Sequence, residues 1–388
     1  MDKKVFYIPT YKECREICDA NDNFTFFETK HQLDGFSISI FSYRLAQPIL
    51  FTNPIPSKPE ITAHEMRGLT FVWNNDGSLF SHFLLMDKFF NLNQSDCSSY
   101  SRMKDEKIKE ITYKEDGSIL SFIKLPNGKI LAKTKASFEA DQAIRAQVIF
   151  EENMAIQKLV TYCVNNGIIP IFEFVGPTNR VVLRYDKTDL VLIKMRYNAT
   201  GEYLSVNDIP TELLEGVTLV KTFNEFTLDD LIAKCETEIG YEGFVVTFES
   251  GKMIKLKLLD YIALHNLHTE DLHREDSIIY LIINEEIDDI LCQLDEGDER
   301  RAMILDLIDL VNSSVNYRFN ETTKLLNTYS GNTKSFVAEN IKHPMFKFAM
   351  TVINRGSDLL TTIKDRILKE TYFLMNARKW IENEKRKL

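Results

Sequence analysis

The sequence contains no Cys-x-x-Cys pair, no long apolar run, no internal repeat and no low-complexity tract. Its six cysteines are scattered along the chain, which argues against a zinc site and predicts reduced thiols in a cytoplasmic protein. Without an apolar stretch of membrane-spanning length, and without an apolar segment after Met1-Asp2-Lys3-Lys4, we expect neither membrane insertion nor a secretion signal.

Positive charge is also in deficit, with 47 Lys and Arg residues against 57 Asp and Glu residues and a net charge of −10. This balance argues against a protein that coats nucleic acid non-specifically. It is compatible with a local basic groove, because phosphate binding depends on where the cations cluster. The 388 residues, 44% of them hydrophobic, are enough for two or three globular domains.

The first part of the chain predicts a mixture of strands and helices. Apolar and polar residues alternate in 36–41, 119–123 and 129–133, and Pro126-Asn127-Gly128 between the last two predicts a hairpin. The segment 136–165 has the apolar spacing of a helix. Strands are then expected again, including Ile169–Val175, Phe244–Phe248 and Met253–Leu259.

The pattern changes near His265, after which strand signals nearly vanish. Helix-period apolar faces follow in 278–294, 301–315, 345–354 and 359–381. Gly356-Ser357 predicts a helix stop followed by a new N-cap. We therefore predict an α+β fold in two domains, a strand-rich domain over 1–265 and an all-helical domain over 266–388.

The run Tyr113-Lys114-Glu115-Asp116-Gly117-Ser118 contains the pattern Lys-x-Asp-Gly, on which covalent nucleotidyltransferases carry a nucleotide. A lysine amine attacks phosphorus only after losing its proton, which nearby cations and partial burial favour. Asp116-Gly117 favours a tight turn that would present Lys114 at a strand end. Taken alone, the pattern more often belongs to an exposed turn lysine.

Lys255 and Lys257 lie two residues apart in Met253–Leu258, and period-two geometry places both on one face of a strand. Two adjacent cations suit a nucleotide phosphate, although a solvated strand face has the same pattern. Glu173, between two phenylalanines, is costly to bury without a partner such as a ribose hydroxyl, a metal ion or a lysine. However, Glu173 could simply be a strand residue held in a salt bridge. Glu242, which precedes Gly243 just ahead of the expected strand Phe244–Phe248, could simply lie in a surface turn.

The order of these groups along the chain narrows the choice. It runs through Arg67-Gly68, Lys88-Phe89-Phe90-Asn91, Lys114-x-Asp116-Gly117, Glu173, Glu242-Gly243 and Lys255-x-Lys257. This order resembles the covalent nucleotidyltransferase superfamily of ATP-dependent ligases and capping enzymes. The longer runs at 88–93, 114–118, 172–180 and 200–203 resemble, more narrowly, the RNA ligase 1 family of T-even phages.

The resemblance implies an ATP-grasp-like nucleotidyltransferase domain with antiparallel sheets over 1–265, followed by a helical RNA-specificity domain. It implies that Lys114 forms a lysyl–AMP adduct, with Asp116 and Gly117 completing its motif. ATP would be contacted by Tyr43, Glu173, Lys255 and Lys257, and its β- and γ-phosphates by Arg67 and Lys88. Lys135, Glu242 and Tyr261 match further functional positions, Glu242 near the ribose or a metal.

The implied activity is ATP-dependent sealing of RNA with 5′-phosphate and 3′-hydroxyl ends, with Mg²⁺ or Mn²⁺ as cofactor. The RNA could include cleaved tRNA, with an end-healing kinase or phosphatase as functional partner. We expect a monomer in the cytoplasm, that of the host if a phage encodes the chain.

DNA ligase, capping guanylyltransferase and a catalytically retired RNA-binding fold are the alternative functions. The first two are disfavoured because no Arg-x-Asp-Lys follows Lys257 and the following residues read as helical.

Two weaker features lie in the helical part. The acidic group at 285–289 could hold Mg²⁺ through Asp288, although an exposed helix face explains it better. The tail combines Arg378, Lys379 and Lys385–Lys387 with Trp380, a mixture that suits RNA, although a solvated helix end explains it better.

Overall fold

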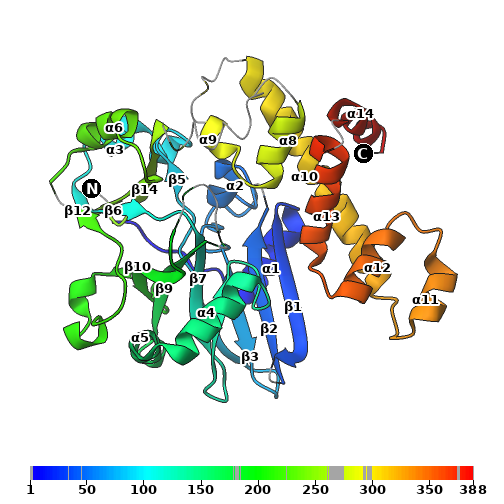
Figure 1. Cartoon of the computed structure of the whole chain (residues 1–388), viewed down its shortest axis with the longest axis horizontal. Helices are drawn as coiled ribbons and strands as arrows, with labels where there is room; N and C mark the ends of the chain where they lie inside the picture. Colours follow the sequence, from blue (N-terminus) through cyan, green and yellow to red (C-terminus); the bar gives the residue numbers. More distant parts are fainter. Residues whose placement is uncertain are drawn as a thin grey trace. The chain divides into compact units, whose positions relative to one another are not determined.

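The structure is a computed structural model. It describes residues 3–33, 35–44, 46–177, 179, 183, 185–223, 225–259, 261, 275–291, 294, 299–373 and 376–387. The chain divides into two compact units, Met1–His265 and Asn266–Leu388. The predicted α+β class is confirmed: described strands are confined to the first unit, and from Glu275 onward the described elements are helical (Figure 1).

The described residues of the first unit form three sheets. Sheet A has the order β1 (Phe24–Leu33), β2 (Phe36–Tyr43), β3 (Leu69–Trp73) and β4 (Leu79–Phe83). Sheet B has the order β12 (Thr222–Phe223), β6 (Ile108–Lys114), β13 (Gly243–Phe248), β14 (Met253–Lys257) and β5 (Phe90–Asn91). Sheet C has the order β11 (Tyr203–Leu204), β10 (Asp189–Tyr197), β9 (Ile168–Val175), β7 (Ser118–Lys124) and β8 (Ile130–Thr134). The strand pairings are antiparallel except that of β14 with β5.

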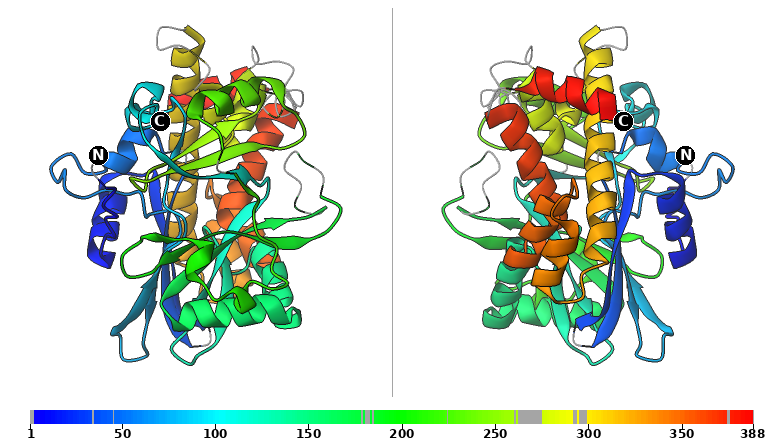
Figure 2. Two further views of the ribbon diagram at one scale, coloured as in Figure 1. Left: turned by 90° about the vertical axis from the view of Figure 1, so that its left-hand side faces the viewer. Right: turned by 90° about the vertical axis from the view of Figure 1, so that its right-hand side faces the viewer.

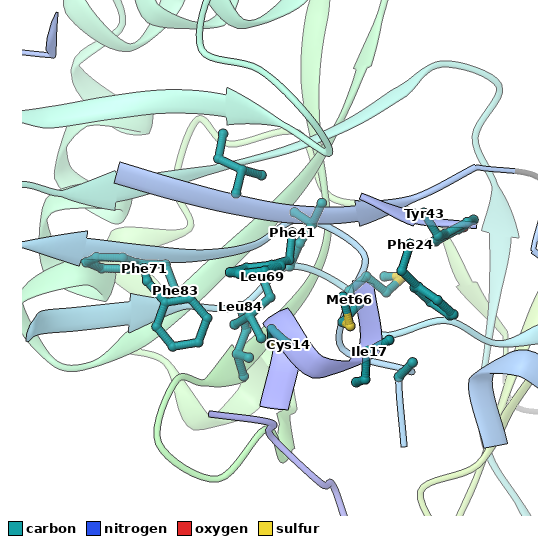
Figure 3. Close-up of a cluster of buried hydrophobic side chains, with 14 of the residues drawn as sticks. Cys14, Ile17, Phe24, Phe41, Tyr43, Met66, Leu69, Phe71, Phe83 and Leu84 are labelled. Atoms are coloured by element: carbon teal, nitrogen blue, oxygen red, sulfur yellow. The ribbon is translucent and has the colours of Figure 1, made fainter. Parts of the chain in front are cut away.

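Helix α1 (Tyr11–Ala20) covers part of sheet A. It begins with a capping box in which Thr10 and Glu13 satisfy each other's backbone N–H groups. Its buried residues Cys14 and Ile17 belong to the same core as Phe41 and Phe71 of the sheet (Figure 3). Short helices α2 (Pro48–Thr52) and α3 (Tyr100–Met103) and a 3₁₀ turn at Asp96–Ser98 connect the strands.

Sheets B and C are each covered by helices on one face. Helices α4 (Asp141–Glu152) and α5 (Met154–Asn165) pack on sheet C through Phe122, Phe150 and Phe172 (Figure 1). Helix α6 (Leu228–Thr237) packs on sheet B through Leu231 and Val246. Because side chains alternate along a strand, the residues between these core positions face the opposite side of each sheet. Two further 3₁₀ turns lie at Val206–Asp208 and Thr211–Leu213.

Two expectations about local structure need correction. The single helix expected over 136–165 is broken, because Asn153 is extended and its side chain accepts from the N–H groups of Ala155 and Ile156, which starts α5. Gly356 does end a helix in the left-handed conformation, as expected, with φ of 62°. However, the cap of the next helix is Asp358, whose carboxylate accepts from Thr361 N, and not Ser357.

The second unit is built on one long helix. Helix α10 (Glu299–Leu326) contacts α8 (Glu275–Ile283), α12 (Phe346–Arg355), α13 (Leu359–Leu368) and α14 (Ala377–Lys387) (Figure 2). The remaining elements are α9 (Asp288–Leu291), α11 (Thr333–Asn340) and a π turn at Lys369–Phe373. In the part of the chain that the structure describes, no helix is long and apolar enough to cross a membrane.

Candidate active site

The register of sheet B brings Lys114 and Lys257 to the two sides of Gly243. Gly243 pairs with Lys114 on β6 and with Lys257 on β14, and Val245 pairs with Lys255. Residues paired directly across a sheet share a face, as do residues two apart on one strand. The three lysines therefore lie on one face, opposite the face that packs on α6.

Gly243 is required here by close backbone approach. A Cβ atom at this position would lie 2.0 Å from the Leu256 carbonyl oxygen and 2.8 Å from Lys257 Cα, with φ of 153°. No side chain fits that space, so the strands carrying the lysines can approach only because the residue between them is glycine.

Glu242 holds two of these lysines at once. Its Oε2 lies 2.5 Å from Lys114 Nζ, and its Oε1 lies 2.9 Å from Lys257 Nζ. The Glu242 side chain is 3% exposed, whereas that of Lys114 is 23% exposed. Burial alone would raise the pKa of Glu242, but the two ammonium groups outweigh burial and lower it. The site thus keeps a charged carboxylate between two cations.

The turn after Lys114 is anchored by tertiary hydrogen bonds. Asp116 Oδ2 accepts from Leu183 N at 2.6 Å, and Oδ1 accepts from the Tyr261 hydroxyl at 3.0 Å. The backbone N–H of Asp116 donates to the Tyr185 hydroxyl at 3.0 Å. At Gly117, a Cβ atom would lie 2.3 Å from the Phe174 carbonyl oxygen, so this residue must also be small. The hydrogen bonds tie the turn to residues between β9 and β10 and to Tyr261 after β14, while Gly117 lies close against β9.

Glu173 lies on β9 on the face of sheet C opposite α4 and α5. Its neighbours across the strands are Ile119 and Val191, and its Cγ is 3.1 Å from the Cβ position of Gly117. Burial raises the pKa of Glu173 to about 8; the charge of Glu242 adds to this rise, and that of Lys114 opposes it. Near neutral pH this carboxyl group is therefore largely protonated and can donate a hydrogen bond.

Cations surround Lys255. Its Nζ lies 4.9 Å from the Phe89 ring, and its register partner on β5 is Asn91. Burial and the neighbouring positive charges lower the pKa of Lys255 well below the usual range. Those charges belong to Lys88, Arg67, Lys114 and Lys257. Such a concentration of cations at the end of a sheet favours binding of a polyanion.

Tyr43 brings two further cations together. Lys88 Nζ lies 5.1 Å and Lys135 Nζ 4.6 Å from the Tyr43 ring, and the rings of Phe51 and Phe90 also face Lys88.

In the loop before β3, Arg67 has two buried donors, Nε and Nη1, for which the described residues provide no acceptor. An anionic ligand such as a phosphate group would accept hydrogen bonds from these two donors.

Asp288, the candidate metal ligand, lies at the start of α9 in the second unit. Within the ranges that the structure describes, no group of three or more His, Cys, Asp or Glu side chains is arranged to hold a metal. Mg²⁺ often uses only one or two protein carboxylates together with substrate phosphates. Glu242 is in direct contact with Lys114 and Lys257.

The tail residues differ from the RNA-binding pattern considered above. Trp380 is 5% exposed and faces the Arg318 guanidinium at 5.8 Å, so its ring has no free face for a base. Arg378 pairs with Glu275, and Lys387 pairs with Glu384. The alternative of an amphipathic helix end explains these residues better.

Sequence reasoning assigned no role to Tyr185, and named Asn91 only as part of a motif; they lie beside Asp116 and Lys255 respectively. Asn91 stands in the run 88–93 and could have been singled out by its position next to Lys88. Tyr185 carries no comparable signal, because its contact with Asp116 spans 69 residues of sequence.

Comparison with known proteins identifies a family for this arrangement. A family model described as RNA ligase matches residues 65–261, just over half of the 388 residues. The match includes the stretch from Arg67 to Tyr261 that carries the candidate site, and Tyr43 lies before it. A Thermovibrio ammonificans protein described as "Putative RNA ligase" is 26% identical over 276 residues, covering 68% of this chain and 69% of its own.

Similar solved structures are also RNA ligases. Naegleria gruberi RNA ligase with pyrophosphate aligns at 17% identity and a TM-score of 0.36, covering 45% of this chain and 56% of its own. A variant of that enzyme with ATP and Mn aligns at 16% identity and a TM-score of 0.37, covering 48% and 59%. An archaeal ATP-dependent RNA ligase aligns at 12% identity and a TM-score of 0.44, covering 79% and 82%. This chain thus spans less than two thirds of the Naegleria chains.

Proposed function

The chain belongs to the RNA ligase family, as expected from its resemblance to the phage RNA ligase 1 group, and on this premise we propose that it is an ATP-dependent RNA ligase that carries AMP on Lys114. The observation that carries the proposal is the meeting of Lys114, Lys255 and Lys257 on one face around Gly243. Residues 1–265 would form the nucleotidyltransferase domain, and residues 266–388 would bind RNA.

Three phosphoryl transfers make up the reaction. The Lys114 amine attacks the α-phosphorus of ATP, the bond to the β-phosphate breaks, and pyrophosphate leaves. An RNA 5′-phosphate oxygen then attacks the same phosphorus and breaks its bond to Lys114, giving a 5′–5′ adenylate. Finally an RNA 3′-hydroxyl attacks the 5′-phosphorus, AMP leaves, and a phosphodiester remains.

The chain's own groups act by positioning and by charge. Lys255 and Lys257 neutralise charge on the α-phosphate, while Arg67 and Lys88 meet the β- and γ-phosphates. Tyr43, Lys135 and Glu173 complete the ATP site, and the protonated Glu173 carboxyl can donate to the ribose. Asp116, Gly117 and Tyr261 hold the turn that presents Lys114.

Glu242 forms an ion pair with the proposed nucleophile. An ion pair stabilises the ammonium form of a lysine, whereas attack on phosphorus requires the neutral amine. Lys114 must therefore separate from Glu242 before it reacts. Glu242 is the carboxylate we propose for Mg²⁺ or Mn²⁺, which supplies charge stabilisation at the phosphates when bound.

The test is transfer of label from [α-³²P]ATP to the protein. The unaltered protein should form a labelled band, Lys114→Ala should form none, and Lys109→Ala, on an exposed position of the same strand, should label normally. A Lys114→Ala protein that still labels would refute the assignment. Labelling with GTP in place of ATP would instead indicate a capping guanylyltransferase.

Sealing distinguishes an active ligase from a retired RNA-binding fold. RNA with a 5′-phosphate and a 3′-hydroxyl should be joined into circles in the presence of ATP and Mg²⁺. Comparing single-stranded RNA, nicked duplex RNA, nicked DNA and a cleaved tRNA anticodon stem-loop would identify the substrate and test for DNA ligase activity. We propose a cytoplasmic monomer, with an end-healing enzyme supplying the 5′-phosphate and 3′-hydroxyl ends.

A further inference from the structure

Buried charged side chains lie behind the loop that carries Arg67. Arg196 on β10 is 0% exposed, and its Nη1 and Nη2 atoms donate to Glu65 Oε2 and Oε1 at 2.9 and 2.6 Å. Arg196 also donates to the carbonyl oxygens of Leu85 at 2.7 Å and Gly201 at 2.9 Å. Glu65 is 2% exposed and lies two residues before Arg67, whose N–H donates to the Glu65 carbonyl at 2.7 Å.

The other side of the same loop is held by Lys133. This lysine on β8 is 0% exposed, and its Nζ donates to the carbonyl oxygens of Gly68 at 2.8 Å and Thr134 at 3.2 Å. Gly68 directly follows Arg67. The loop is thus fixed before Arg67 through Glu65 and after Arg67 through Gly68, in each case by a fully buried basic side chain.

The loop that carries Lys88 is connected to the same network. Asp87, which is 1% exposed, accepts from the Tyr203 hydroxyl at 2.6 Å and pairs with Lys4. Lys88 N donates to the His64 carbonyl at 2.8 Å, which joins the two loops directly. Burial alone would raise the pKa of Asp87, but Lys4 and Arg196 outweigh it and lower the pKa to about 2.

Buried ion pairs are a costly way to stabilise a fold, because apolar residues of similar size often do as well. The planar guanidinium of Arg196 adds fixed geometry, because it donates at once to both carboxylate oxygens of Glu65 and to two backbone carbonyl groups and so fixes their relative positions. We propose that Arg196, through Glu65, and Lys133, through the Gly68 carbonyl, are positioning residues that aim Arg67 and Lys88 at the β- and γ-phosphates of ATP. The proposal rests on the function proposed above.

Its consequence is specific to one step. The β- and γ-phosphates are present while ATP is bound and absent once pyrophosphate has left. Loosening Arg67 and Lys88 should therefore weaken ATP binding and adenylylation of Lys114. It should leave AMP binding, and sealing of RNA that is already adenylylated, nearly unchanged.

Arg196→Lys is the first variant, because it keeps the charge and most of the volume but cannot form the fork. Lys133→Met is the second variant, because it removes the side chain that donates to the Gly68 carbonyl. Lys133 lies on β8 and not on β10, so this variant remains informative if Arg196→Lys fails to fold. Lys194→Met is the matched control, since it removes another buried basic residue of β10, whose partly exposed ion-pair partner Glu110 lies on β6. Circular dichroism and thermal unfolding would establish that each variant is folded.

Calorimetry with ATP and with AMP is done in a Lys114→Ala background, where ATP is not consumed. We expect roughly tenfold weaker ATP binding in Arg196→Lys and in Lys133→Met, the size of one lost charge-assisted contact, with AMP binding within about twofold. Lys194→Met should leave the ratio of the two affinities unchanged. Equal losses for ATP and AMP, or unchanged ATP binding in both variants, would overturn the proposal.

Single-turnover kinetics give the second readout, with Lys114 intact. Formation of protein–AMP should slow by about the factor lost in ATP affinity, while sealing of pre-adenylylated RNA should stay within about twofold. Equal slowing of both steps would mean a purely structural role for Arg196 and Lys133. If the unaltered protein neither labels nor seals, the proposed function itself fails, and this outcome is distinct from the others.

Discussion

Lys114 Nζ lies 2.5 Å from Glu242 Oε2, so the candidate nucleophile of this protein is held in an ion pair by a buried carboxylate. The same carboxylate reaches Lys257 with its other oxygen at 2.9 Å. One residue therefore links the strand end that carries Lys114 to the strand that carries the lysine pair. The energetics of the site depend on this shared partner.

Removing both lysines should cost more than the sum of the single changes. Lys114→Ala or Lys257→Ala leaves Glu242 with one cation, whereas the double variant leaves a carboxylate that is 3% exposed with neither. We expect an extra loss of about 1–3 kcal/mol in the free energy of unfolding, measured by denaturant titration. Adding Glu242→Gln to the double variant should recover most of it. Strict additivity would show that Glu242 does not couple the two lysines.

Gly243→Ala should disrupt the site and the fold together. The new methyl group would lie 2.0 Å from the Leu256 carbonyl oxygen, which is backbone and cannot rotate away. We expect a loss of about 3 kcal/mol or more in stability, and weaker protein–AMP formation in the fraction that remains folded. The control is Gly240→Ala, where φ is +91° but no atom lies within 4 Å. It should cost only about 1–2 kcal/mol, and equal losses would exclude the clash as the cause.

Glu173 should make stability fall as pH rises from about 4.5 to 8. Its pKa is about 8 in the folded protein, against an ordinary value of 4.5, so in this range the folded chain retains a proton that the unfolded chain releases. Its stabilising contribution is complete below pH 4.5 and is lost as pH rises through 8. The slope is at most about 1.4 kcal/mol per pH unit for one group.

Glu173→Gln should remove this contribution, because an amide mimics the neutral carboxyl and does not titrate. The difference in unfolding free energy between the unaltered protein and Glu173→Gln should therefore change steadily between pH 5 and 8. The control for the loss of one carboxylate elsewhere is Glu152→Gln, at an exposed position of α4. A flat difference for Glu173→Gln would mean that Glu173 is ionised throughout this range.

Much of the fold could be predicted because strands and helices have different periods. Alternation predicted β2, β7, β8 and β14, and Asn127-Gly128 predicted the turn between β7 and β8. The break at Asn153 could not be read from apolar spacing, since the residues on both sides have the period of a helix. A single side-chain cap decides it.

The candidate site was predicted as a set of residues but not as a geometry. The strand containing Lys255 and Lys257 has one lysine face because side chains alternate along it. The position of Lys114 beside that face depends on the pairing of β6 and β14 with β13. Likewise, Asp116-Gly117 was expected to form a local turn. The structure shows that the Asp116 carboxylate is held by Leu183 and Tyr261, far away in sequence.

The sequence by itself determined the family, the α+β class and the residue types of the site, because these depend on local order and spacing. Tertiary structure alone decided that one carboxylate bridges Lys114 and Lys257, that burial raises the pKa of Glu173, and that Arg196 and Lys133 are buried behind Arg67. The physical reason is that burial and charge neighbours arise when distant segments pack together. A lysine on a surface and a lysine in a core have the same letter in a sequence.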